Sequence, residues 1–282
     1  MTSRRRAGAL AVALCLVAGC SGGDEEPDRK AMLDDAFDAT FEAGTAGLGF
    51  LFRIENLPPE LGDVSVAGEG QTSLSGNGAT LKLNVSEGLA EFSGATPGRI
   101  DLVDDGAEAF IRLGADGAAL WRPIDDGARR PDEGGFDLLA GTDPSAGLAF
   151  VAEAAVAADV EVEDLVRERP ATRYEVTLDP ERVSASGRGR GIADQLLALG
   201  FDQVFAYVWL DDAGRVVRVR YDADLARLEG GGPFGAGGRF VTEFELFDFG
   251  APLQVELPPS PERASEPVDQ AELQLLLGGL GI

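Results

Sequence analysis

Alternation of apolar and polar residues over short runs is the feature of this chain that most restricts its fold. In the run LGFLFRI, every second residue from Leu48 to Ile54 is apolar. Because successive side chains of a strand point to opposite faces of a sheet, this run predicts a half-buried strand. The runs VAGEGQTSL, TLKLNV and AFIRL behave in the same way, and glycine-rich turn signals separate them. The first half of the chain therefore predicts an antiparallel meander.

Three segments have the apolar spacing of helices instead. Residues 29–42 place Met32, Leu33 and Phe37 on one face, and the run DPSAGLAFVAEAAVAA has a proline at the first helical position. A shorter helix is predicted in IADQLLALG. Strands resume in VEVEDL, TRYEVTL, FAYVWLD, VVRVRY and RFVTEFELFDFG. About ten strands without regular strand-helix alternation predict an α+β fold with a single antiparallel sheet that twists and curls.

Two strand runs depart from simple alternation. FAYVWL is apolar at both parities, which predicts a central strand covered on both sides. VAGEGQTSL places Gly68 and Gly70 at the parity that faces inward, and we interpret these glycines as room left inside the curve of the sheet.

The N-terminus has the organisation of an export signal. Three arginines at positions 4–6 precede an apolar run from Ala7 to Ala18 that is too short to span a bilayer. The run ends in LVAGC, residues 16–20, which resembles a bacterial lipobox. The resemblance implies cleavage before Cys20 and attachment of diacylglycerol and palmitate to it, whereas an ordinary secretory signal is the alternative. Because two or more acyl chains anchor a protein durably, we expect the outer face of the cell membrane as its location.

Composition divides the chain into four parts. Residues 1–19 are the predicted lipoprotein signal peptide, and residues 20–27, rich in glycine, serine and acids, are a predicted flexible tether. Residues 28–259 are predicted to form one domain. Residues 260–282 are predicted to be a proline- and acid-rich linker followed by an apolar C-terminal tail.

Charge and residue usage exclude several function classes. The formal net charge of −25 opposes binding of nucleic acid. The chain contains no histidine, and its second cysteine, Cys15, leaves with the signal peptide, which removes the usual nucleophile pairs and zinc or haem ligand sets. We therefore predict no enzyme activity, no catalytic residue, no cofactor and no metal site. Three aspartate pairs precede glycines and are interpreted as acidic turns: Asp104-Asp105, Asp125-Asp126 and Asp211-Asp212.

The order of these segments resembles the LppX/LprG group of actinobacterial lipoproteins, which have the LolA-like fold. The resemblance covers most of residues 28–259 and is sharpest in VWLDDAGRVVR, residues 208–218, and in Asp248-Phe249-Gly250 followed by Pro258. It implies a strongly curved antiparallel sheet, a half barrel, with helices on its concave side and an apolar cavity between them. Several members of the group bind or carry envelope lipids and lipoglycans.

Two hypotheses for function follow. The first is a monomeric, membrane-anchored lipoprotein that binds or carries a lipid or lipoglycan and passes it to an envelope transporter partner. The second is a non-carrier interaction or sensor module with a solid core. Under the first hypothesis the alternation and the resemblance together predict a set of residues that line the cavity. Under the second hypothesis the same residues are part of the solid core. They are Phe50, Phe52, Gly68, Gly70, Leu81, Leu83, Ile111, Leu113, Phe244 and Leu246.

Overall fold

A computed structural model of the chain describes residues 29–56, 64–75, 78–87, 98–114, 119–125, 144–187, 189–198, 200–224 and 238–269. The expected signal peptide, tether and apolar C-terminal tail lie outside these residues. The elements are α1 (Arg29–Glu42), β1 (Thr45–Glu55), β2 (Val64–Ser73), β3 (Ala79–Val85), β4 (Gly98–Asp104), β5 (Ala109–Leu113), β6 (Arg122–Pro123), α5 (Pro144–Ala154), β7 (Ala155–Val166), β8 (Arg169–Leu178), η2 (Pro180–Arg182), α6 (Arg190–Ala198), β9 (Val204–Leu210), β10 (Val216–Asp224), β11 (Arg239–Phe247) and η5 (Ser260–Glu262).

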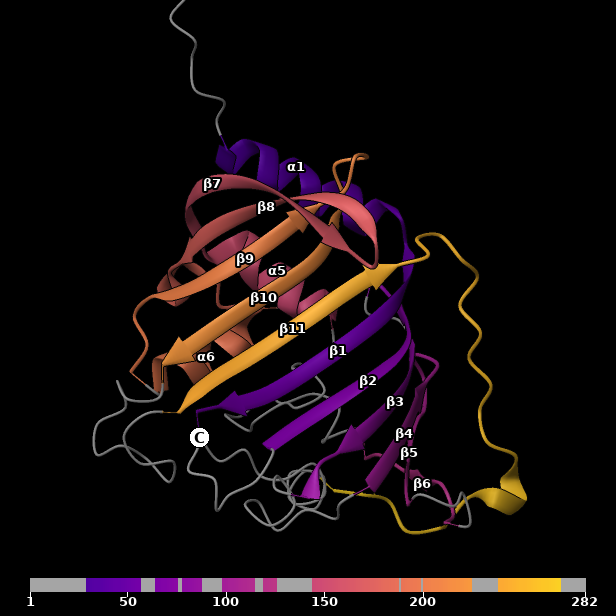
Figure 1. The fold of residues 1–282 in the computed structure, drawn as a ribbon. Coiled ribbons are helices and arrows are strands. Elements are labelled where there is room, and N and C mark those ends of the chain that lie inside the picture. The colour runs from indigo at the N-terminus through magenta and orange to yellow at the C-terminus, as the bar shows by residue number, and fades with distance from the viewer. Residues whose placement is uncertain are drawn as a thin grey trace, which may run out of the picture.

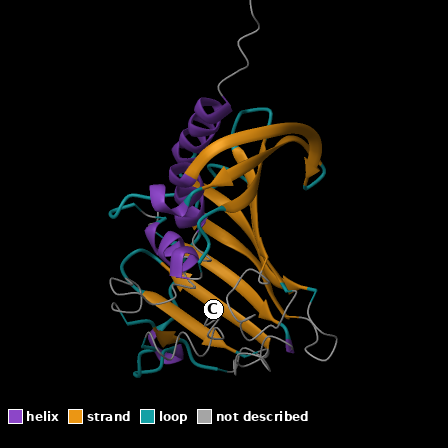
Figure 2. Ribbon diagram, turned by 90° about the vertical axis from the view of Figure 1, so that its left-hand side faces the viewer, coloured by secondary structure: helices purple, strands orange, loops and turns teal. Residues whose placement is uncertain are grey.

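The strands form one eleven-stranded antiparallel sheet in the order β6-β5-β4-β3-β2-β1-β11-β10-β9-β8-β7. Two meanders, β1 to β6 and β7 to β11, meet where the last strand pairs with the first (Figure 1). The predicted single antiparallel sheet is confirmed, and Figure 2 shows that it is strongly curved. Because one sheet continues through both meanders, the strands on either side of α5 belong to the same folded unit.

Strand register places alternating apolar residues of neighbouring strands on one face of the sheet. Phe50 of β1 lies opposite Phe244 of β11 and Gly68 of β2, and Gly68 lies opposite Leu83 of β3. We call this the inner face, and the face that carries Glu243 and Glu245 the outer face. One large buried cluster joins the inner face to α1, α5 and α6, and it forms the main core.

The helices lie on one side of the sheet (Figure 2). Helix α1 buries Leu33, Ala36, Phe37 and Thr40. The Thr40 hydroxyl donates to the Ala36 carbonyl at 2.7 Å and accepts the backbone N–H of Val216 at 2.8 Å, which fastens the helix to the start of β10. Because a buried backbone N–H needs an acceptor, this threonine satisfies the N–H of Val216 from the helix.

The second predicted helix is shorter than its apolar run. The run predicted a helix through residue 158, but α5 ends at Ala154 and the chain continues directly into β7. Residues 155–158 pair with β8, with Ala155 opposite Leu178. Alanine has a strong helix propensity, so this correction is a case in which pairing with a neighbouring strand outweighs local propensity.

The predicted linker after Pro259 is part of the folded unit. Arg263 and Val268 make parallel bridges to Trp121 and Ile124, and Val268 is fully buried. Before this point, Val255 and Leu257 pack on a small outer-face cluster that includes Phe110. We call residues 251–269 the C-terminal strap. The described chain therefore stays packed against the sheet beyond Pro259, as far as Val268.

Strand β9, the run FAYVWL, is covered on both sides as its composition predicted. Ala206 and Val208 are buried in the main core on the inner face. Trp209 is buried on the outer face in a second cluster with Val166, Ala171 and Val217. The cover is incomplete at the start of the strand, where Phe205 is 44% exposed.

Gly68 and Gly70 do not leave room inside the curve. A Cβ atom at Gly68 would overlap the carbonyl oxygen of Lys82, and one at Gly70 would overlap that of Thr80. Both glycines therefore allow close backbone approach between β2 and β3, a common reason for glycine within a strand. This corrects the interpretation of the two glycines as room left inside the curve of the sheet.

Candidate functional site

The ten predicted cavity residues all lie on the inner face. In the strand register Leu48 and Phe50 connect β11 to β2, and Leu81 and Leu83 continue the row through Leu102 and Ile100 to β5. Seven of the ten are buried. Gly68, Gly70 and Leu113 are half-buried. The structure thus brings together residues from five strands, β1, β2, β3, β5 and β11.

Aromatic rings fill one part of this face. The rings of Phe50 and Phe244 lie 5.6 Å apart, Tyr221 lies 6.2 Å from Phe244, and Phe150 of α5 lies 6.4 Å from Tyr221. A Cβ at Gly147 of α5 would be 2.9 Å from the Phe244 ring, so the helix backbone rests directly on it. We call this the aromatic part of the inner face, and it is solidly packed.

The aromatic part surrounds the Tyr221 hydroxyl with apolar groups, and this burial raises the pKa of the hydroxyl. A hydrogen bond between Tyr221 and Thr242 acts in the opposite direction on this pKa but is the smaller effect.

The other part of the inner face consists of aliphatic residues on β3, β4 and β5. Leu81, Leu83, Ile100 and Ile111 are buried in the main core, and Leu113 at the end of β5 is half-buried. Ile124 and Val268 belong to the same cluster, so the C-terminal strap contributes to this part. We call it the aliphatic part. Its side chains are flexible and chemically uniform, unlike the interlocked rings of the aromatic part.

Two of the predicted acidic turns are confirmed. The Asp104 carboxylate accepts the N–H of Gly106, and that of Asp105 accepts the N–H groups of Ala107 and Glu108 at 2.8 and 2.7 Å. Asp211 forms the β9–β10 turn by accepting the N–H groups of Ala213 and Arg215. Asp126 lies outside the described residues. Within the part of the chain that is described, no group of acidic residues is placed to hold a metal ion.

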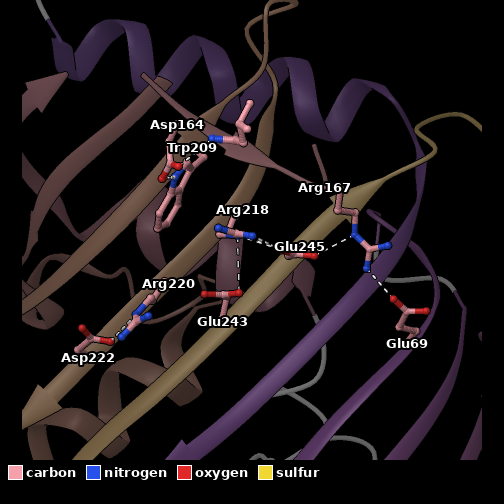
Figure 3. Close-up of polar contacts among 10 residues, drawn as sticks. Glu69, Asp164, Arg167, Trp209, Arg218, Arg220, Asp222, Glu243 and Glu245 are labelled. Carbon is pink, nitrogen blue, oxygen red and sulfur yellow. Dashed lines mark hydrogen bonds and ion pairs between the residues drawn. The ribbon is translucent and has the colours of Figure 1, made fainter. Parts of the chain in front are cut away.

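The outer face carries a row of ion pairs that alternation did not predict (Figure 3). Arg218 pairs with both Glu245 and Glu243, at 3.6 Å to the second. Arg167, in the turn between β7 and β8, donates to Glu245 at 2.9 Å and to Glu69 of β2 at 2.7 Å. Its guanidinium also lies 3.7 Å from the centre of the Phe247 ring. The sequence signal for this contact is weak, because Arg167 and Glu69 are far apart in the chain.

Two clefts border Arg167. One of about 370 Å³ lies on the outer face between Glu69, Asn84 and Glu243. The other, of about 280 Å³, lies between the β7–β8 turn and Val217, Phe247 and Phe249. Both are on the side of the sheet opposite the predicted cavity residues, although Phe50, Gly68 and Leu246 contribute atoms to their walls.

Two carboxylates of the outer face have pKa values shifted in opposite directions. Burial acts to raise the pKa of Asp101, but hydrogen bonds from Arg112 and Arg99 outweigh it and hold this pKa below its usual value. Burial raises the pKa of Glu243; the positive charge of Arg218 opposes the shift and the negative charge of Glu245 adds to it. The arginines around Asp101 therefore stabilise its charged form. For Glu243 the attraction of Arg218 does not offset the cost of burying the charge.

Comparison with known proteins identifies the fold. No protein-family model and no curated protein matches the chain. Among solved structures, the chain is similar to LprF from Mycobacterium bovis, with 16% identity and a TM-score of 0.53 over 83% of this chain and 98% of that one. The chain has the LppX/LprG-type fold. This agrees with the resemblance found in the sequence.

Two further structures are more distant. Lipoprotein LppX from Mycobacterium tuberculosis has 13% identity and a TM-score of 0.47 over 82% of this chain and all of that one. A DUF1329 family protein from Desulfovibrio piger has 10% identity and a TM-score of 0.28 over 80% of this chain and 95% of that one. Among the described residues, no helix is both long enough and apolar enough to cross a membrane.

Proposed function

We propose that this protein is a membrane-anchored envelope lipoprotein that binds the acyl chains of a lipid or lipoglycan between its sheet and its helices. The observation that carries the proposal is the continuous apolar inner face, on which residues from five strands meet without an intervening charged side chain among them. Burial of acyl chains there would stabilise the complex by about 0.8 kcal/mol per methylene. The lipobox supports the anchor at Cys20.

We place the acyl chains over the aliphatic part of the inner face. The aromatic part is filled by interlocked rings and by the backbone of α5 at Gly147. Aliphatic side chains can change rotamer at lower cost than a packed ring cluster, and Leu113 already retains exposed surface. In this arrangement the helices cover the concave side of a half barrel over β7 to β11, and the lipid occupies the side nearer β3 to β5.

Native mass spectrometry tests lipid binding directly. The chain is purified as a Cys20→Ala variant, so that any added mass is non-covalent, and it is expected to carry lipid or to take up a fluorescent fatty acid. Leu113→Trp should reduce this binding, because the larger ring occupies the proposed acyl site. Leu120→Trp is the matched control, since Leu120 is 52% exposed and lies outside the inner face. A Gly70→Leu variant is unsuitable, because its side chain would disrupt the β2–β3 pairing.

The anchor requires a separate measurement. Intact mass of the mature protein should show cleavage before Cys20 and the added mass of diacylglycerol, and Cys20→Ala should release the protein from membranes. A mature protein with an unmodified Cys20 would refute the anchor without affecting the lipid-binding proposal.

The alternative, a solid-core interaction or sensor module, is favoured by the dense aromatic part. If the wild-type chain contains no lipid, takes up no fatty acid, and is destabilised by Leu113→Trp as any packed core would be, the alternative replaces the carrier proposal.

A further inference from the structure

We propose that the end of the β7–β8 hairpin is a hinged flap over the outer face, held closed by Arg167. We define the flap as residues 164–171. It reaches β11 and β2, which do not pair with β7 or β8, since β9 and β10 lie between β8 and β11 in the sheet. Figure 3 shows the Arg167 side chain extending over β11 toward Glu69, which connects the end of the sheet to its middle. This inference concerns the outer face and does not depend on lipid binding.

The two residues of the turn are poorly suited to its backbone conformation. Val166 pairs with Arg169, so Arg167 and Glu168 form a two-residue turn in which both residues have positive φ, 49° and 63°. Glycine and asparagine are preferred at such positions, because a side chain with a Cβ is strained there. A non-optimal residue pair at a strained turn indicates that a side chain has a role beyond forming the turn.

The role of Arg167 is indicated by the site that receives it. Its guanidinium lies on the Phe247 ring and between two carboxylates, Glu245 and Glu69. Opposite it on β1, Gly49 lacks a side chain, and a Cβ there would be only 3.0 Å from the Arg167 Nη2 atom. A Cβ at Gly47 would overlap the Phe247 ring. The two glycines thus leave space for the ring and the guanidinium.

The contacts of Arg167 differ in strength. Glu69 is 68% exposed, so its ion pair is screened by water and contributes little. Glu245 is 18% exposed and is also held by Arg218, so this pair and the stacking on Phe247 hold the flap. Arg169, at the other end of the same turn, lines the smaller cleft but has no ion pair or ring contact within the described residues.

Closing the flap covers apolar surface. Val166 and Ala171 come from the flap, and Trp209 and Val217 come from the strands beneath it; together they form the second buried cluster. Asp164 accepts a hydrogen bond from the indole N–H of Trp209 at 2.9 Å, which adds a second tie near the base of the flap. The cleft of about 280 Å³ beneath the turn shows that packing there is incomplete. A few contacts over an unfilled space are typical of segments that open locally.

Quenching of tryptophan fluorescence by acrylamide tests the flap. The chain has two tryptophans, so Trp121→Phe leaves Trp209 as the only reporter. In this background Arg167→Asn, which suits the turn but cannot reach Glu245, should raise the quenching constant of Trp209. Arg169→Asn is the matched control and should leave it unchanged. Hydrogen exchange at β1 and β9 should show that the main core of the Arg167→Asn variant remains folded.

A second variant disrupts the contact between Arg167 and Glu245 from strand β1. Gly49→Val leaves the turn intact but displaces the guanidinium, and it should also raise quenching of Trp209. This result is decisive if Arg167→Asn fails to fold. The proposal would be overturned if the quenching constant of Trp209 in the folded Arg167→Asn and Gly49→Val variants were the same as in the parent. It would also be overturned if Arg169→Asn raised this constant as much as Arg167→Asn does. None of these readouts requires lipid, so they fail or succeed separately from the carrier proposal.

Discussion

At the scale of single residues, the most informative side chains of this protein are charged groups on the outer face. Asp101 is 5% exposed and receives hydrogen bonds from Arg99 at 2.7 Å and from Arg112 at 2.5 Å. Arg112 in turn lies 4.5 Å from the centre of the Trp121 ring. A buried carboxylate satisfied by two arginines holds β4 and β5 together, since Asp101 and Arg112 lie opposite each other. Removing its charge leaves two guanidinium groups without a charged partner.

We predict that Asp101→Asn lowers the free energy of unfolding by about 1 to 2 kcal/mol. Because the folded pKa of Asp101 is below its usual value of 3.8, its contribution is complete above that pH and is lost as the pH falls through the folded pKa. Urea unfolding at pH 7 and at acidic pH measures both effects. The variant should differ from wild type at pH 7 and converge with it in acid; a constant difference would contradict the ion-pair explanation.

Glu243 should behave in the opposite way. Its pKa is raised above the usual value of 4.5, so the folded state binds the proton more tightly than the unfolded chain does. The contribution of Glu243 to the stability of the folded protein should therefore decrease as the pH rises from that value through the folded pKa. Glu243→Gln should remove this decrease and make the protein modestly more stable at pH 7. A loss of stability at pH 7 would mean that the Arg218 pair outweighs the cost of burial.

At the scale of elements, the C-terminal strap extends the packed part of the described chain beyond Pro259. It closes the β6 edge of the sheet through backbone hydrogen bonds, including Val268 N–H to Pro123 at 2.8 Å and Asp125 N–H to Val268 at 3.0 Å. An exposed sheet edge is a site for aggregation, so the strap protects the edge as well as filling the core.

Val268→Ala should therefore reduce the free energy of unfolding by about 1 to 3 kcal/mol, because the Val268 side chain is fully buried. Glu266→Ala is the control, since Glu266 is exposed and contributes only its backbone carbonyl to the contact with Arg122. Thermal unfolding of both variants measures the difference. Equal stability of the two would indicate that residues after 259 behave as the linker that composition predicted.

The sequence predicted strands, faces and turns better than it predicted what lies opposite them. Alternation placed Phe50, Leu83 and Phe244 on one face, because side-chain direction is a local property. It misjudged Gly70, because the nearby carbonyl belongs to another strand. The sequence did not predict the ion pairs of Arg167 for the same reason. Its partners, Glu69 and Glu245, belong to other strands, and nothing in a two-residue Arg-Glu turn indicates them.

At the scale of the whole molecule, one sheet joins both halves of the described chain. Its central pairing, β1 with β11, lies between two meanders whose own pairings are local. We predict that heat or urea unfolds the domain in a single cooperative transition, since neither meander buries its inner face without the shared core. Circular dichroism and the fluorescence of Trp121 and Trp209 should give the same midpoint, while separate midpoints would indicate two independent units.

The pairing of the first strand with the last also sets the order of events during synthesis. Phe50 and Phe244 are about 190 residues apart in the chain, so the middle of the sheet cannot close until β11 has been made. Until then the edges of β1 and β10 are both open. For a chain synthesised from its N-terminus, this connectivity delays completion of the sheet until nearly the whole of the described chain has been made.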